Sequence, residues 1–276
     1  MAGKQLLKQR IKSITTIRKI TKAMEMIANA KLLKTRHLME NNREYSNCIK
    51  DTVNDILAGS VAVNNQYLEK NNSPKSAIII MANNLGMCGG YTAKINAKVL
   101  EIVNQDDVLY LVGNKGVNNL INHGYQITSL LSSDGFEFKD AVNISEEVLA
   151  KYRNKEIGSV KVVYTEFVNS GTFEPMVMNL LPYIPIKENT KHQEIIYEPN
   201  ADTILDDLIP MMVTNMIYST FMRAKTAEQG ARRLAMESAS DNADELKEKL
   251  TLSYNQARQQ SITQEITEIV AGADAI

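Results

Sequence analysis

The chain has 276 residues, of which 44% are apolar, enough for one large domain or two small ones with a real core. Its net charge of −1 gives no overall attraction to nucleic acid, and two cysteines, Cys48 and Cys88, are too few for a disulfide framework. The aromatic share of 6%, without tryptophan, is low, as in coiled coils, whose seams use aliphatic residues and alanine.

No apolar run approaches the ~20 residues of a transmembrane helix. The basic N-terminus lacks the apolar stretch of a signal peptide, and it is richer in lysine than a transit peptide and continues directly into a helix. We therefore expect a soluble, cytosolic protein.

The first predicted element is one long helix from residue 4 to residue 58, a stretch without glycine or proline. At ~1.5 Å per residue it is about 80 Å long. Its apolar residues recur at intervals of three or four, the helical period. These residues are Leu7, Ile11, Ile14, Ile17, Ile20, Met24 and Ile27, followed by Leu38, Tyr45, Ile49, Val53 and Ile56.

This helix is strongly basic near its start. Ten Lys or Arg and a single acid, Glu25, lie between Lys4 and Arg36, and the basic residues surround the helix. The pattern is typical of a solvated coiled-coil face or of a surface that fits an acidic partner.

Residues 75–200 alternate between strand and helix patterns, which predicts a compact α/β domain with a mainly parallel, Rossmann-like sheet. A hairpin around residues 169–171 is expected near its end. The predicted strands are 76–82, 107–112, 125–131, 159–167, 173–180 and 195–198, and the predicted helices are 91–103, 114–122 and 140–154.

The sharpest local motif in this domain is NLGMCGG, residues 84–90, placed between a strand and a helix, where phosphate-binding loops occur. It lacks the Gly-Lys-Ser/Thr of a Walker A loop, and its glycines do not fit G-x-G-x-x-G. We interpret it as a tight structural turn, with Cys88 as a small buried or turn residue. Because no metal-spaced cluster or catalytic arrangement stands out, we expect no catalytic residues, no cofactor and no metal.

The last predicted element is a helix within residues 206–276, about 100 Å long. Asp206 or Asp207 is the expected N-cap, which places Pro210 in the first turn, where its missing N–H breaks no bond. Alanines at small intervals continue the apolar stripe in the middle of the helix, and Ala23, Ala28 and Ala30 are similarly small on the first helix. The ridge comprises Ala224, Ala227, Ala231, Ala235, Ala239 and Ala243.

These patterns predict an α+β protein in which the N- and C-terminal helices form a long, slim, antiparallel two-helix coiled coil. The expected divisions are residues 1–58, 75–200 and 206–276. A helical bundle is the plainer alternative, but it needs further helices of similar length. The segment 254–276 is expected to extend beyond its partner helix and to need an enclosing surface, because Ile262, Ile266 and Ile269 keep a regular spacing that speaks against a frayed tail.

Four motifs carry a resemblance to a known family. Residues 11–34, with the core ITKAMEMIA, resemble the N-terminal signature of the gamma subunits of F-type ATP synthases. LGMCGGY at 85–91 resembles the glycine turn of that family, and residues 231–242 and 254–272 resemble its C-terminal signatures. The match spans the chain and is thin in the central domain apart from the glycine turn.

The resemblance implies a non-catalytic rotor shaft that transmits torque from an ion-driven ring of c subunits to three alpha and three beta subunits, with epsilon bound at the foot. It implies ATP synthesis coupled to hydrogen-ion or sodium-ion transport, no binding of nucleic acid and a peripheral position at the cytoplasmic face of a bacterial membrane. The absence of a transit peptide and of a plant-type regulatory cysteine pair favours a bacterial source.

By the same resemblance, Met24, Arg232 and Gln259 are expected near a lever loop of beta. Contacts with a beta catch loop are expected at Arg258, Thr263, Gln264 and Glu265. Lys19 and Lys22 are weaker candidates for the acidic lever loop, and Met24 is equally compatible with plain packing in the seam.

Two other functional classes fit parts of the sequence. A coiled-coil scaffold with a globular hinge, as in chromosome-organising ATPases, would need longer arms and a terminal Walker A motif. A Rossmann-type enzyme would need the dinucleotide loop that is missing here.

Overall fold

The computed structural model describes residues 2–59, 65–169, 171–185, 197–198 and 200–273. They form two compact units. The first unit lies within residues 1–29 and 232–276, and the second lies within residues 30–231. No helix among the described residues is both long and apolar enough to cross a membrane.

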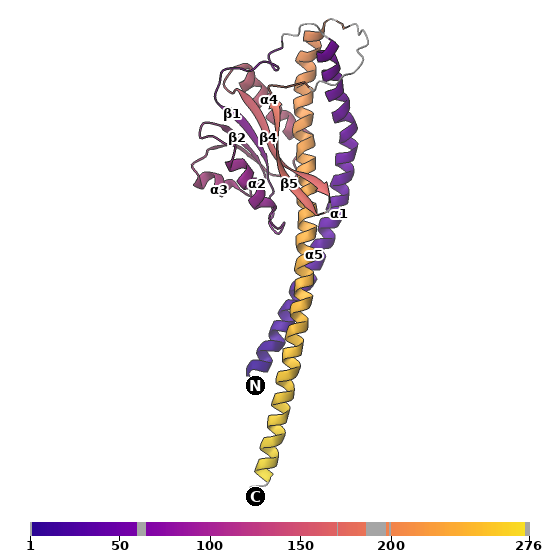
Figure 1. Cartoon of the computed structure of the whole chain (residues 1–276), viewed down its shortest axis with the longest axis vertical. Coiled ribbons are helices and arrows are strands. Elements are labelled where there is room, and N and C mark those ends of the chain that lie inside the picture. Colours follow the sequence, from indigo (N-terminus) through magenta and orange to yellow (C-terminus); the bar gives the residue numbers. More distant parts are fainter. Residues whose placement is uncertain (1, 60–64, 170, 186–196, 199, 274–276) are drawn as a thin grey trace. The chain divides into compact units, whose positions relative to one another are not determined.

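The two long predicted helices are confirmed. Helix α1 spans Ala2–Gly59, 58 residues, and α5 spans Ala201–Ala273, 73 residues. In the first unit they run antiparallel, because Arg18 bonds Asp244 at 2.9 Å while Thr21, further along α1, meets Ser240, earlier in α5, at 2.8 Å (Figure 1).

The seam of the first unit follows a heptad along α1. Half-buried or buried side chains occur at Leu7, Ile11, Ile14, Thr21 and Ala28. Ile17, Ile20 and Ile27, which share this spacing in the sequence, lie outside the seam, since they are 48%, 54% and 56% exposed. Helix α1 carries two apolar stripes with the same 3–4 spacing, and only the stripe that follows the heptad is covered by α5.

The alanine prediction is correct for α5 and partly wrong for α1. All six alanines of the ridge are buried or half-buried. On α1, Ala28 is 1% exposed, whereas Ala23 and Ala30 are exposed. Part of the ridge is not buried by α1, since Ala227 and Ala231 pack with Cys88, Tyr91, Phe167 and Phe173 of the α/β domain.

The predicted start of the last helix is also wrong. Helix α5 begins at Ala201, because the Asn200 side chain accepts the backbone N–H of Thr203 at 2.9 Å and so provides an N-cap. Pro210 consequently lies inside the helix rather than in its first turn. Its missing N–H leaves the carbonyl of Asp206 without the usual helical donor.

The second unit contains a five-stranded sheet in the order β3-β2-β1-β4-β5. All pairings are parallel except β4–β5, as predicted. The strands are β1 Ser76–Met81, β2 Val108–Val112, β3 Ile127–Leu131, β4 Ser159–Asn169 and β5 Thr172–Leu181. The strand predicted at 195–198 lies partly outside the described residues, and residues 197–198 are not in a strand.

Helices cover both faces of this sheet (Figure 1). One face packs against α2, Tyr91–Leu100, and α3, Val117–Asn122, through Ile95, Val99 and Leu120. The other face packs against α4, Phe138–Arg153, and the parts of α1 and α5 that belong to this unit. Side chains alternate between the two faces along β1, so Ile78 and Ile80 join the first cluster and Ile79 and Met81 join the second.

Of the three glycines in the 84–90 turn, only one is at a position whose backbone conformation requires glycine. Gly89 adopts a left-handed φ of 58°, whereas a Cβ at Gly86 or Gly90 would meet nothing within 4 Å. Cys88 is buried at 3% exposure, next to the amide of Asn83. Helix α3 begins later than predicted because Gly116, directly before it, has a φ of 105°.

Candidate partner-binding surface

The predicted contact residues of α1 differ in how available they are. Met24 is half-buried beside the seam. The Lys22 ammonium lies 2.9 Å from both carboxylate oxygens of Glu25, so part of its charge is already neutralised. Lys19 is exposed and forms no ion pair within the described part of the chain. Lys19 is therefore the more available cation.

Arg232 differs from the other predicted contact residues of α5 because it is buried. Its exposed fraction is 6%, and it interacts with other groups of the chain. The next residue, Arg233, is half-buried and pairs with Glu237 at 3.1 Å. A buried guanidinium holds its surroundings in place more readily than it reaches a partner.

The predicted contact residues further along α5 are all exposed. Gln259, Thr263 and Gln264 line a shallow, open groove on one face of the helix, together with Gln256, Gln260 and Thr267. Glu265 accepts a hydrogen bond from Ser261 at 3.0 Å, and Gln264 donates one to Glu268 at 2.9 Å. This part of α5 thus offers amides, hydroxyls and two carboxylates to a partner.

The structure groups these residues differently from the prediction. Gln259 follows Arg232 by about 40 Å along α5, at the ~1.5 Å rise of a helix. Met24 lies much nearer the level of Arg232, since Thr21, one turn before Met24, pairs with Ser240, about two turns after Arg232. Gln259 therefore lies with Arg258 and Thr263, at a different level of the first unit from Met24 and Arg232.

The end of α5 exposes apolar side chains that the seam leaves uncovered. Every residue with a described side chain from Ile262 to Ala271 is exposed, and Ile266 and Ile269 reach 56% and 70%. Figure 1 shows this part of the helix extending past the first residues of α1. A helix with apolar residues on its free surface is typical of a surface that another protein encloses.

Within the second unit, α5 is joined to the loops at the carboxyl ends of the strands. Lys225 pairs with Asp134 at 2.9 Å, and the Asn84 amide donates to the same carboxylate at 3.1 Å. The hydrogen bond from Lys225 lowers the pKa of Asp134 below its usual value of 3.8, and the hydrogen bond from Asn84 adds to this effect. No local sequence pattern indicates this ion pair, because its partners lie far apart along the chain.

A second polar cluster joins β4 to α5. Arg223 pairs with Glu166 at 3.0 Å, and the Tyr164 hydroxyl donates to the same carboxylate at 3.0 Å. Burial raises the pKa of Tyr164 to about 12, and the charge of Glu166 adds to this effect. The Tyr91 hydroxyl also donates to the carbonyl of Ala224 at 3.1 Å, so α2 is bonded to α5 as well.

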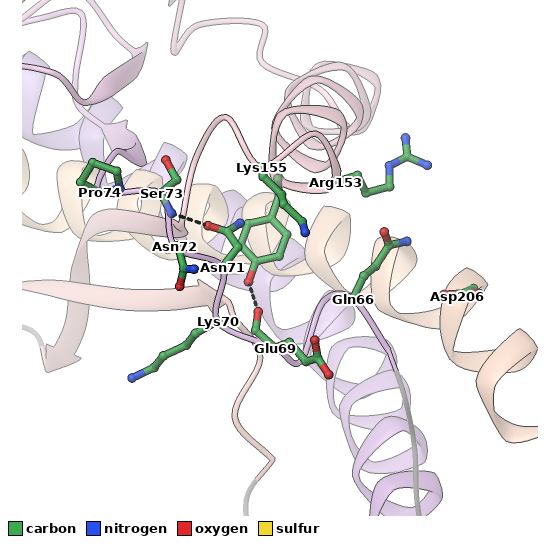
Figure 2. Close-up of a pocket in the computed structure, with 11 residues that line it drawn as sticks. Gln66, Glu69, Lys70, Asn71, Asn72, Ser73, Pro74, Arg153, Lys155 and Asp206 are labelled. Carbon is green, nitrogen blue, oxygen red and sulfur yellow. Dashed lines mark hydrogen bonds between the residues drawn. The ribbon is translucent and has the colours of Figure 1, made fainter.

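An open hollow of about 840 Å³ lies at the opposite, amino ends of the strands (Figure 2). In this view Lys70 and Arg153 point away from the other lining residues. Glu69 and Asp206 add carboxylates to its lining. Because cations and carboxylates are mixed, the hollow selects no single charge.

No group of three His, Cys, Asp or Glu among the described residues is arranged to hold a metal ion. The paired helices of the first unit expose both polar and apolar faces. These faces suit contact with another protein.

Comparison with known proteins gives matches over the whole chain. Residues 4–276 match a family model described as ATP synthase. The chain is 36% identical over 285 residues to the ATP synthase gamma chain of Alkaliphilus metalliredigens, with 99% of each chain covered. It is 38% identical to the ATP synthase gamma chain of Desulforamulus reducens, with 100% of each chain covered.

Solved structures share the fold. One chain of the Euglena gracilis mitochondrial ATP synthase, from a structure of its OSCP/F1/c-ring in rotational state 3, superposes with a TM-score of 0.71 at 16% identity, over 99% of this chain and 94% of that one. A chain of the rotor in rotational state 1 gives a TM-score of 0.67 at 15% identity, over 95% of this chain and 99% of that one.

Proposed function

The chain belongs to the ATP synthase gamma chain family and is the central rotor shaft of that enzyme, and we propose that it works by presenting different faces of its paired helices to the catalytic beta subunits. The full-length match carries this conclusion, because it covers both long helices and the inserted domain together. A coiled-coil scaffold with a globular hinge finds no support among these relatives.

The proposed assembly places the first unit inside a ring of three alpha and three beta subunits and the α/β domain at the foot, bound to epsilon and to the ring of c subunits. The complex lies at the cytoplasmic face of a bacterial membrane, to which this chain is peripheral. Ion flow turns the c ring and the foot, and the shaft forces the three beta sites through different conformations in turn. The chain itself supplies no catalytic residue in this scheme.

Torque transmission requires that each conformation of beta contacts a different face of the shaft, since only differential contacts shift a conformational equilibrium. The first unit supports this requirement. Its seam is on one side, and the other sides present basic, apolar or amide-rich surfaces.

We assign two levels of contact with beta. At the lower level, the lever loop meets Met24 and Lys19, with Lys22 less available and buried Arg232 holding the local shape of α5. At the upper level, the catch loop meets Arg258, Gln259, Thr263, Gln264 and Glu265. The exposure of all five upper residues supports this assignment, as does the groove that Gln259, Thr263 and Gln264 line.

Co-purification with the cognate alpha and beta subunits tests the shaft role. We expect a stable complex with one copy of this chain and an ATPase turnover above that of the alpha–beta mixture alone. Absence of a complex, with this chain forming a defined oligomer by itself, would refute the shaft role.

Met24→Lys tests the lower level of contact. It adds a charge beside the proposed lever-loop contact, so ion pumping per ATP hydrolysed by the reconstituted enzyme should fall while ATPase activity persists. Met26→Lys is the matched control, because Met26 is 65% exposed on another side of the same turn. Equal coupling in the two variants would count against the lower contact.

A further inference from the structure

The sheet of the second unit has a topological switch point between β1 and β4. The chain leaves β1 through α2 toward β2, but after β3 it crosses through α4 to β4 on the other side of β1. In open parallel sheets, ligands bind outside the carboxyl ends of the strands at such a point. In this chain the glycine turn and the start of α2 follow β1 there.

A small pocket of about 160 Å³ lies at this position. The start of α2 contributes Gly90, Tyr91 and Lys94, β4 contributes Thr165, and β5 contributes Thr172 and Glu174. All of these residues belong to the second unit. The pocket is distinct from both proposed contact levels with beta, which lie in the first unit.

The start of α2 is open to a ligand. The helix has ten residues, no side chain among the described residues caps it, and its first turn has no acidic residue. The Tyr91 N–H already bonds the carbonyl of Cys88 at 3.3 Å, and the helix dipole together with the N–H groups of the following residues makes this end partly positive. A Cβ at Gly90 would meet nothing within 4 Å, so a ligand can approach the backbone closely.

The second observation is the hydroxyl of Thr165. This residue is 3% exposed, and its Oγ1 is buried without a hydrogen-bond partner among the described residues. A buried hydroxyl without a partner carries a free-energy cost, because it has lost its hydrogen bonds to water. An acceptor placed in the pocket would remove that cost, which independently indicates a ligand with hydrogen-bonding oxygens.

We propose that this pocket binds a small oxyanion of the size of inorganic phosphate. The oxyanion would accept hydrogen bonds from the start of α2, from Lys94 and from Thr165. At about 30 Å³ for each water, the volume suits one tetrahedral oxyanion with a few waters and leaves no room for a nucleoside. The glycine turn thus lacks a nucleotide motif yet retains the anion-binding geometry of its position in the fold.

Glu174 gives the site a distinctive property. Its carboxylate is exposed and lines the same pocket as Lys94. Like charges repel, so Glu174 weakens anion binding while Lys94 strengthens it. Neutralising these two residues should therefore change the affinity in opposite directions.

Equilibrium dialysis of the purified full chain against labelled inorganic phosphate, at constant ionic strength and without alpha or beta subunits, tests the proposal. We expect saturable binding of one phosphate per chain. Lys94→Gln should weaken it about tenfold, as for loss of a charge-assisted hydrogen bond, and Glu174→Gln should strengthen it. Lys98→Gln, one turn further along α2, is the matched control and should leave the affinity unchanged.

Thr165→Val and Gly90→Ala test the remaining groups. Thr165→Val removes the hydroxyl at nearly constant shape, and Gly90→Ala fills the approach at an ordinary φ of −77° without touching the core. Both should weaken phosphate binding, with Gly90→Ala remaining decisive if Thr165→Val fails to fold. The proposal is overturned by the absence of saturable binding, by affinities that Lys94→Gln and Gly90→Ala leave unchanged, or by ADP binding more tightly than phosphate.

Discussion

At the scale of single residues, Gly113 illustrates how the close packing of the sheet restricts side-chain size. It follows β2, has a φ of 104°, and donates its N–H to the carbonyl of Leu131 at 2.7 Å. A Cβ there would lie 2.6 Å from the backbone carbon and oxygen of Ala82. Backbone cannot yield as a flexible side chain can, so this position admits only glycine.

We predict that Gly113→Ala lowers the free energy of unfolding by about 2–4 kcal/mol, from left-handed strain and overpacking together. Denaturant unfolding of the full chain measures this. Gly86→Ala is the control, because a Cβ at Gly86 meets nothing within 4 Å, and it should change stability by less than about 0.5 kcal/mol. Equal midpoints for the two variants would contradict the prediction.

The Asp134–Lys225 ion pair predicts a pH dependence. The folded pKa of Asp134 is lowered, so its contribution is fully present above the usual value of 3.8 and is lost as the pH falls through the folded pKa. The Asp134 side chain is 56% exposed, so the contribution is at most about 1 kcal/mol.

We therefore expect Asp134→Asn to be less stable than the wild type at pH 7, with a difference that shrinks below pH ~4. Denaturant titrations at a series of pH values give this difference directly. Asp106→Asn removes an exposed carboxylate that has no ion pair in the described part of the chain, and it serves as the control. A difference that stays constant as the wild type approaches acid unfolding would show that charge is not its cause.

At the scale of elements, α1 predicts a difference between two neighbouring lysines. Lys22 already forms an ion pair with Glu25, whereas Lys19 forms no ion pair within the described residues. If the partner surface is acidic, Lys19→Gln should slow association with the alpha–beta complex more than Lys22→Gln does. Stopped-flow association rates measure this, and the difference should vanish at high salt. A larger effect of Lys22→Gln would contradict the proposed lower contact.

The sequence predicts the elements better than it predicts their faces. Periodicity gave both long helices and the parallel sheet, because burial on one or both sides leaves a regular pattern. It could not choose between the two apolar stripes of α1, since Ile17 and Ile20 keep the same spacing as the seam residues. It also missed Asn200 as the N-cap, because Asp206 and Asp207 are equally good capping residues and the side-chain bond to Thr203 is visible only in the structure.

The candidate surface was predictable only in part. The basic start of α1 and the isoleucines at the end of α5 are visible as sequence patterns. The burial of Arg232, the pairing of Lys22 and the pocket at Thr165 depend on residues far apart in sequence or on packing, which no local pattern reports.

At the scale of the whole molecule, stability is unevenly distributed between the two units. The second unit has large apolar clusters on both faces of its sheet. In the first unit, Ala28 is the only buried residue among the described side chains of α1, and polar side chains such as Thr21 and Arg18 occupy seam positions. A two-helix seam with so little buried apolar surface gains little free energy from its own packing.

This asymmetry predicts the pattern of amide hydrogen exchange in the isolated full chain. Amides of residues 3–29 and 244–271 should exchange much faster than those of β1, β2 and β4, because local opening costs little where few apolar contacts are lost. Assembly with alpha and beta subunits should slow exchange in both helical segments and leave the sheet unchanged, since the surrounding ring supplies the burial that the seam lacks. Mass spectrometry of peptides from both states measures this, with the peptides of β1 as the internal control. If the helical segments of the isolated chain were as protected as the sheet, the shaft would be rigid by itself, and its exposed isoleucines would need another explanation.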